Sequence, residues 1–77
     1  GGSRVRRQEI MQRLETLTTR ERQVLDMVAG GQTNKGVARL LGISEKTVEI
    51  HRAKVMEKMQ AKSLAELVRM AAALDAD

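Results

Sequence analysis

The sequence contains no cysteine, no proline and no aromatic residue, and it has a single histidine, His51. Without cysteine the chain can form neither a disulfide framework nor a cysteine zinc site, and one histidine argues against a histidine metal site. The lack of aromatic rings argues against base stacking of the kind seen in RNA-recognition sheets and OB barrels. We therefore expect no metal and no cofactor.

Long apolar runs are missing as well, and no segment has the length of a membrane span or the pattern of a signal peptide. We therefore expect a cytoplasmic protein without membrane contact. The 77 residues allow one small domain. Such a domain has a small hydrophobic core, so it usually needs a cross-link or a binding partner to be stable. Residues 1–3, Gly-Gly-Ser, are expected to be a cloning remnant, residues 4–16 a linker helix and residues 17–77 the domain itself.

The net charge of +4 is unevenly distributed along the chain. The segment 32–62 contains seven basic residues and three acidic ones, whereas the residues after it contain one basic and three acidic residues. The seven basic residues are Lys35, Arg39, Lys46, Arg52, Lys54, Lys58 and Lys62. An anionic partner is therefore expected at the middle of the chain, although a lysine-rich helix is often only a solvated face.

Start and stop signals divide the chain into helices, and no alternation of apolar and polar residues predicts a strand. The linker helix has Ile10, Met11 and Leu14 at helical spacing, and Leu17 directly after it continues the pattern. Thr18 and Glu21 form a capping box that opens the next helix, which should end at Gly30-Gly31. Its apolar stripe consists of Val24, Leu25 and Val28.

The second half of the chain predicts three more helices. One begins at Thr33 and ends at Gly42, a residue suited to a left-handed C-cap, and its apolar residues are Val37, Ala38, Leu40 and Leu41. Ile43 should fold back on Ala38, and Ser44 should cap a helix over 45–59. A further capping box, Ser63-Leu64-Ala65-Glu66, opens a last helix that reaches about Leu74. The fold class is therefore all-α, a four-helix helix-turn-helix domain preceded by the linker helix.

The helix over 45–59 has a core side and an outward side. At about 100° per residue, Val48, Val55 and Met59 fall on one line. The outward side mixes Lys46, Ile50, Ala53 and Glu57, with Glu49 on one shoulder and Thr47, Lys54 and Lys58 on the other. This mixture suits the major groove of DNA, where lysines neutralise phosphates, glutamate accepts from cytosine and an apolar side chain meets a thymine methyl. A single exposed isoleucine is also ordinary on a protein surface.

The preceding helix supports the groove interpretation. Its first residues, Thr33, Asn34 and Lys35, combine free backbone amides with a cation, which suits a phosphate. Two helices joined by a short turn with glycine form a helix-turn-helix, in which the second helix reads the bases.

Four motifs in this order resemble the LuxR-type DNA-binding domain, and most of all the FixJ branch of response regulators. The motifs are LTTRERQVL (17–25), TNKGVARLLGIS (33–44), KTVEIHRAKVMEKM (46–59) and KSLAELVRMA (62–71). The resemblance implies sequence-specific binding of double-stranded DNA by a transcriptional regulator. It also implies a homodimer on an inverted repeat and an upstream receiver domain that is phosphorylated on an aspartate. RNA polymerase is a further candidate partner.

The resemblance also implies roles for single residues. Together with the helical wheel it gives base-reading residues, which are Lys46, Glu49, Ile50 and Ala53. Phosphate contacts are expected from Thr33, Asn34, Lys35, Thr47, Lys54 and Lys58. Gly36 departs from the family pattern, because relatives commonly have Glu or Gln there, and a glycine inside a helix costs roughly 0.5–1 kcal/mol relative to alanine. We expect the start of this helix to fray more easily.

The last helix is apolar around too much of its circumference for one core stripe. Either the linker helix covers it, or a second copy does, or it is simply an over-apolar terminal helix. We favour a two-fold dimer, which would place two reading helices about 34 Å apart. Dimerisation is expected through Leu64, Leu67, Val68, Ala71 and Leu74.

Other functions are less well supported. The sequence has no paired carboxylates, no nucleophile with a base and no phosphate-binding glycine loop, so we do not expect an enzyme. His51 is more typical of a packed or phosphate-adjacent structural histidine, and Met56, Met59 and Met70 of core filler. A sigma-factor promoter-binding region and a helical protein-interaction module remain as alternatives.

Overall fold

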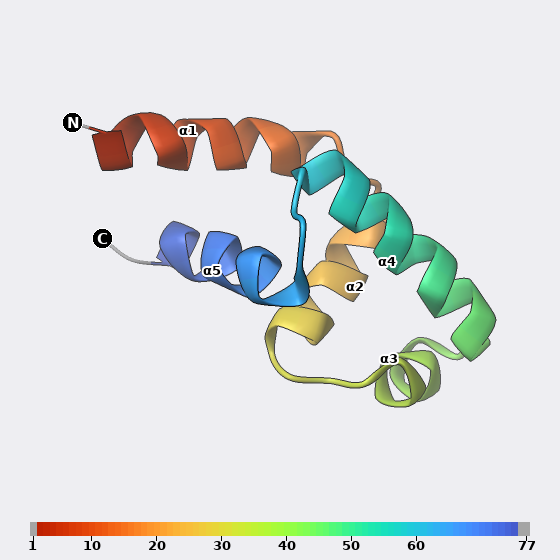
Figure 1. Cartoon of the computed structure of the whole chain (residues 1–77). Helices are drawn as coiled ribbons and strands as arrows, with labels where there is room; N and C mark the ends of the chain where they lie inside the picture. The colour runs from red at the N-terminus through yellow and green to blue at the C-terminus, as the bar shows by residue number, and fades with distance from the viewer. Residues whose placement is uncertain (1, 76–77) are drawn as a thin grey trace.

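Five helices and no strand make up the described part of the computed structural model, which covers residues 2–75 and the side chains of residues 6–74 (Figure 1). The helices are α1 (Gly2–Glu15), α2 (Thr19–Ala29), α3 (Asn34–Leu41), α4 (Glu45–Met59) and α5 (Leu64–Asp75). The predicted all-α class is confirmed. Residues 2 and 3, which are expected to be a cloning remnant, lie in the first turn of α1. None of the helices in residues 2–75 is long and apolar enough to cross a membrane.

The predicted caps explain where the middle helices begin and end. The Thr18 hydroxyl accepts a hydrogen bond from the Glu21 amide at 3.1 Å, and the Glu21 carboxylate accepts one from the Thr18 amide at 2.9 Å. Thr33 and Ser44 cap α3 and α4, and Gly42 has the left-handed conformation that ends α3. Each of these caps depends on residues only a few positions apart in sequence, which is why the sequence predicted them.

The predicted capping box at the start of α5 is only half formed. The Ser63 hydroxyl accepts from the Glu66 amide at 3.1 Å, as expected. The Glu66 carboxylate, however, accepts from the backbone amide of Lys62 at 3.4 Å rather than from that of Ser63. The chain before α5 therefore enters the helix along a different path from that of a full capping box.

Two apolar clusters form the core, and α4 belongs to both. One cluster joins α1, α2, α4 and α5 through Ile10, Leu25, Val55, Met59, Leu67 and Met70. The other joins α2, α3 and α4 through Val24, Val28, Val37, Ala38 and Val48. Because Val48, Val55 and Met59 are all fully buried, the core side predicted for α4 is confirmed, and α4 is held along its whole length.

The N-terminal helix α1 lies beside α5 and against the end of α4 (Figure 1). Ile10 is only 1% exposed in this contact. The guanidinium groups of Arg7 and Arg13 donate to the backbone carbonyls of Leu74 and Met59, at 3.3 and 3.4 Å, at the last turns of α5 and α4. Cations near helix C-termini are favourable because the carbonyl groups there carry partial negative charge. The helix expected as a linker therefore packs onto the domain.

Two apolar residues that the periodicity assigned to core stripes are exposed instead. Met11 on α1 is 50% exposed, and Leu40 on α3 is 61% exposed. Both lie next in sequence to a residue that does pack on the core, Ile10 and Leu41 respectively. A helix turns by about 100° per residue, so Met11 and Leu40 point away from the contacts that Ile10 and Leu41 make.

Replacing Gly36 with alanine should stabilise the domain by about 0.5–1 kcal/mol, since glycine is the poorer residue inside a helix. A Cβ atom at this position would meet the Oε1 atom of Gln32 at 2.6 Å, which is the free end of a flexible side chain and can move away. Urea unfolding would measure the change. Gly42→Ala is the matched control, because the positive φ of +69° at Gly42 should make alanine destabilising there. A loss of stability in Gly36→Ala would show that the Gln32 side chain is not free to shift.

Candidate nucleic-acid interface

The junction of α3 and α4 is a short turn of the helix-turn-helix type. Gly42 ends α3 with φ 69° and ψ 35°, and the amide of Ile43 donates to the carbonyl of Ala38 at 3.0 Å. Ile43 packs against the cluster that contains Ala38, as predicted. Ser44 then caps α4 by accepting from the Thr47 amide at 3.1 Å. The turn leaves α4 crossing α3 at one end of the molecule (Figure 1).

The outward side of α4 brings the four predicted base-reading residues together. Lys46, Glu49, Ile50 and Ala53 are all exposed. Ile50 is 54% exposed, whereas Val48 and Val55 on the opposite side of the same helix are completely buried. Ile50 thus projects from a helix that is firmly held from behind. The face is therefore accessible, and its backbone is supported by both core clusters.

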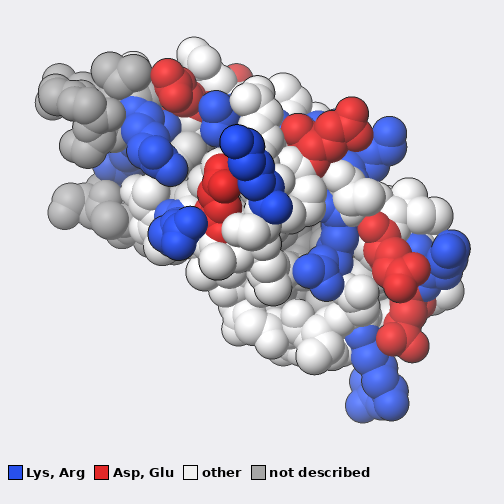
Figure 2. Space-filling model, in the orientation of Figure 1, with Lys and Arg blue, Asp and Glu red and all other residues white. Residues whose placement is uncertain are grey.

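Charges of both signs occur on this side of the molecule. Figure 2 shows basic and acidic side chains interleaved along the edge that α4 forms. Lys46 and Lys54 are exposed, and so are Glu49 and Glu57. The face is therefore less positive than its lysines alone suggest, and part of the cationic surface must come from neighbouring residues, such as Lys35 and Arg39 on α3.

The first turn of α3 lies beside α4, and two of its polar side chains already form hydrogen bonds within the domain. The Thr33 hydroxyl accepts from the Gly36 amide at 3.1 Å, and the Asn34 side-chain oxygen accepts from the guanidinium of Arg52 at 2.6 Å. Lys35 is exposed, with its ammonium group available to an anion. At the start of α4, the Thr47 hydroxyl lies 2.9 Å from that of Ser44.

Lys58, which was expected to contact a phosphate, forms an ion pair within the domain. Its Nζ atom lies 2.7 Å from the Oε1 atom of Glu21 on α2, in an ion pair whose carboxylate side chain is only 7% exposed. The same oxygen accepts from the amide of Thr18. The hydrogen bond from Lys58 and the one from the Thr18 backbone hold the pKa of Glu21 below its ordinary value of 4.5, against the opposing effect of burial. Lys58 therefore holds α4 on α2, and its phosphate contact stays a prediction.

Sequence reasoning missed the functions of Arg52 and Glu21. Arg52 was counted among the basic residues and Glu21 only as part of a cap, but each ties α4 to a neighbouring helix. A signal existed for Arg52, because it lies near the core line of α4, where a cation must find a partner. For Glu21 the sequence carried no signal, since its partner is 37 positions away.

The surface predicted for dimerisation is divided between the core and solvent. Leu67 is only 3% exposed in the domain's own core, so it cannot serve a partner, and Leu74 packs against the same cluster. This corrects the predicted set, because α1 covers that side of α5. Leu64 and Val68 remain 44% and 37% exposed.

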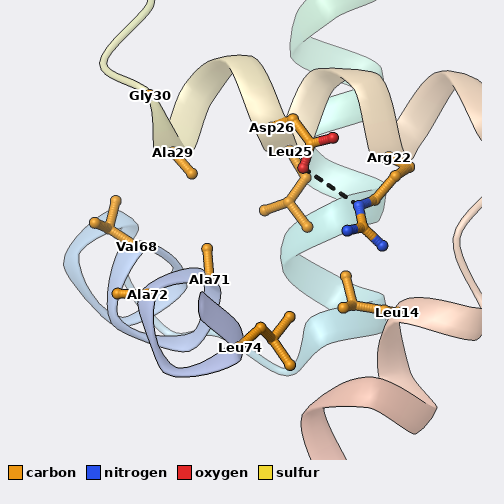
Figure 3. Close-up of a pocket in the computed structure, with 10 residues that line it drawn as sticks. All are labelled: Leu14, Arg22, Leu25, Asp26, Ala29, Gly30, Val68, Ala71, Ala72 and Leu74. Carbon is orange, nitrogen blue, oxygen red and sulfur yellow. Dashed lines mark hydrogen bonds and ion pairs between the residues drawn. The ribbon is translucent and has the colours of Figure 1, made fainter. Parts of the chain in front are cut away.

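A hollow of about 340 Å³ lies between α2 and α5, closed at one end by Leu14 of α1. In Figure 3 the side chains of Val68, Ala71, Ala72 and Leu74 border it from α5. Arg22 and Asp26 of α2 border it on the other side, joined by an ion pair of 3.3 Å that is largely exposed. Its chemistry is mixed, with apolar side chains on α5 and charged ones on α2.

His51 is half-buried on α4. In the part of the chain that the structure describes, no group of three His, Cys, Asp or Glu residues is placed to hold a metal ion.

A supported helix with exposed polar and apolar side chains, set in a helix-turn-helix, defines a class of DNA-binding domains. Comparison with known proteins agrees: residues 15–71 match the model of the LuxR family of bacterial regulatory proteins. The transcriptional regulatory protein FixJ of Rhizobium meliloti is 60% identical over 65 residues, which are 84% of this chain and 32% of that protein. The tetrathionate response regulatory protein TtrR of Salmonella typhimurium is 51% identical over the same shares of the two chains.

Among solved structures, the C-terminal transcriptional activator domain of FixJ from Sinorhizobium meliloti superimposes with a TM-score of 0.73 at 61% identity. The superposition covers 83% of this chain and 81% of that domain. This chain belongs to the LuxR family of bacterial regulatory proteins. It is a DNA-binding domain of the kind found in FixJ-like response regulators and not an enzyme, which confirms the resemblance seen in the sequence and favours it over the sigma-factor alternative. The chain spans about a third of the length of the two curated relatives.

Proposed function

We propose that this domain binds an inverted repeat of double-stranded DNA as a homodimer, with α4 of each copy in the major groove. The observation that carries this proposal is the exposed side of α4, where Lys46, Glu49, Ile50 and Ala53 project from a helix buried on its other side. Such a face can approach base edges closely at Ala53 and offers an apolar contact at Ile50, a cation at Lys46 and an acceptor at Glu49.

Phosphate contacts would flank the reading side chains. Lys35 of α3 and Lys54 of α4 are exposed and provide the charges, while the polar groups of Thr33, Asn34 and Thr47 provide hydrogen-bond donors. These contacts would fix the position of α4 on the duplex without distinguishing one sequence from another.

Dimerisation would use the side of α5 that the domain leaves exposed. Leu64, Val68 and Ala72 are spaced four residues apart, so they form one exposed stripe along α5. An isologous contact between two such stripes would relate the two copies by a two-fold axis and match the symmetry of an inverted repeat. Ala71 lies at the edge of this stripe.

In the whole protein, a receiver domain before α1 would control this domain by phosphorylation of an aspartate. The name of TtrR describes a response regulator, and α1 packs against α5, the proposed dimer helix. A change transmitted through α1 would therefore reach the dimer surface directly. The protein would act in the cytoplasm, where RNA polymerase is a candidate partner.

Lys54→Ala should weaken binding to every DNA sequence alike and flatten the plot of log affinity against log salt by roughly one unit per copy, about two units for the dimer, because each copy loses one phosphate contact. Fluorescence anisotropy with a cognate and an unrelated duplex would measure both effects. Arg6→Ala is the control, since it removes the same charge from an exposed position on α1. A loss confined to one sequence would make Lys54 a base-reading residue instead.

Selection of bound sequences from a random DNA pool tests the proposed function as a whole. We expect an inverted repeat whose half-sites are about one helical turn apart, about 34 Å. Recovery of a single half-site would leave α4 as the reader but would refute the homodimer. Failure to enrich any sequence, with binding that does not depend on salt, would favour a protein-interaction module.

A further inference from the structure

The side chain of Arg52 lies along the core of the domain, and its guanidinium group ends beside Asn34 at an open hollow. Its side chain borders the core beside Val24, Val28 and Val55, and its end reaches α3, where Nη1 donates to the Asn34 side-chain oxygen at 2.6 Å. Long basic side chains commonly lay their methylene groups on apolar surface in this way. The hydrogen bond joins residues 18 positions apart and connects the middle of α4 to the first residue of α3.

This hydrogen bond determines which way the carboxamide of Asn34 faces. A guanidinium can only donate, so the oxygen of the carboxamide must be the atom turned toward Arg52. The NH2 group, which carries two donors, is then fixed on the other side of the same carboxamide carbon. Asn34 is only half-buried, and it borders an open hollow of about 470 Å³ together with Thr33, Lys35 and Arg52.

We propose that Arg52 is a positioning residue for DNA binding, which holds Asn34 so that its NH2 group donates to a phosphodiester oxygen beside Lys35. The proposal rests on the proposed function, in which this part of α3 meets the DNA backbone. It assigns Arg52 a role in recognition that acts through Asn34. A hydrogen bond to a charged phosphate is stronger than one between neutral groups, so its loss should be measurable.

Asn34→Asp separates this role from a purely structural one. The aspartate still offers an oxygen to Arg52, and a negative charge in the first turn of a helix is favourable, so the free energy of unfolding should stay the same or rise. The outward NH2 donor, however, is replaced by an oxygen that repels phosphate. We therefore expect Asn34→Asp to bind both cognate and unrelated duplexes at least about tenfold more weakly than the wild type, while folding at least as well.

Two further variants control for the added charge and test the link to Arg52. Gln32→Glu adds a negative charge two residues before Asn34 and leaves the donor in place, so its loss of affinity should be clearly smaller. Asn34→Ala removes the donor without adding charge, and it should weaken binding without changing the salt dependence, since a neutral donor displaces no counterion. Arg52→Met keeps much of the apolar stem and should lower affinity by a similar factor.

The decisive result is a double-mutant cycle on DNA affinity between Asn34→Ala and Arg52→Met. If Arg52 acts through Asn34, the double variant should bind about as well as either single variant. Additive losses would refute the positioning role, and wild-type affinity in Asn34→Asp would refute the phosphate contact. Should Arg52→Met fail to fold, Asn34→Asp still decides the phosphate contact. A wild-type domain that binds no DNA would instead refute the proposed function, and the two failures are therefore distinguishable.

Discussion

Replacing Lys58 with methionine should lower the free energy of unfolding by about 2–4 kcal/mol, a large share of the stability of a domain this small. The substitution keeps the length of the side chain but removes the partner of the Glu21 carboxylate, which is almost fully buried and lies 2.7 Å from Nζ. The expected loss is smaller than for a completely buried pair, because the Thr18 amide still donates to Glu21. Urea unfolding at pH 7 would measure it.

The difference in stability between the wild type and Lys58→Met should depend on pH. The pKa of Glu21 is lowered in the folded protein, chiefly by the hydrogen bond from Lys58. Its contribution to stability is therefore complete above the ordinary value of 4.5 and is lost as the pH falls through the lower folded pKa. In Lys58→Met the carboxylate takes up its proton more easily, so the stability gap to the wild type should narrow below about pH 4.5. A gap that stays constant from pH 7 to acid would contradict the role of this ion pair.

Glu21→Gln is the matched control for Lys58→Met. Glutamine can still accept from the Thr18 amide and so retains the capping box, and it leaves no buried charge behind. We expect Glu21→Gln to cost less than Lys58→Met, and Lys58→Met to add little in the Glu21→Gln background. Additive losses would mean that the two side chains stabilise the domain independently.

Ile50→Ala should change the preferred base at one position of each half-site, with a cost on the order of 1–3 kcal/mol per half-site. Ile50 is the large apolar side chain on the outward side of α4, 54% exposed, and a thymine methyl is the base feature that it suits. Because a dimer carries the substitution twice, the effect on the whole operator should be roughly double that on one half-site. Selection from a random DNA pool with the wild-type and variant domains would reveal the change.

Leu40→Ala is the control for Ile50→Ala. Leu40 on α3 is 61% exposed, so Leu40→Ala removes about as much exposed apolar surface as Ile50→Ala. The removed surface, however, does not lie on the outward side of α4. It should leave the selected sequence unchanged. If Ile50→Ala also returned the unchanged sequence, Ile50 would not be a base-reading residue.

Local signals allowed the helices to be predicted from the sequence. The caps at Thr18, Thr33 and Ser44 and the left-handed Gly42 each depend on neighbours within a few residues, and the helix over 45–59 has the predicted bounds. The exposed side of α4 was predictable for the same reason, since the helical period alone separates exposed Ile50 from the buried residues of the same helix.

Contacts between distant helices could not be predicted in this way. Lys54 and Lys58 lie only about 40° apart on a helical wheel of α4, yet only Lys58 lies opposite the buried Glu21 of α2. Likewise, the apolar excess of α5 was visible in the sequence, but its division between the core at Leu67 and the solvent at Val68 depends on where α1 packs. To predict such contacts, one must know how the helices lie relative to one another, and the periodicity of a single helix does not carry this information.

Chemical-shift mapping with the duplex obtained by selection tests most directly whether α4 is the part of the domain that enters the DNA. The proposed function predicts that the largest amide shifts on titration occur at Lys46, Ile50 and Ala53, with further shifts at Asn34 and Lys35. Shifts concentrated on α1 or on the hollow between α2 and α5, with the outward side of α4 unchanged, would contradict it.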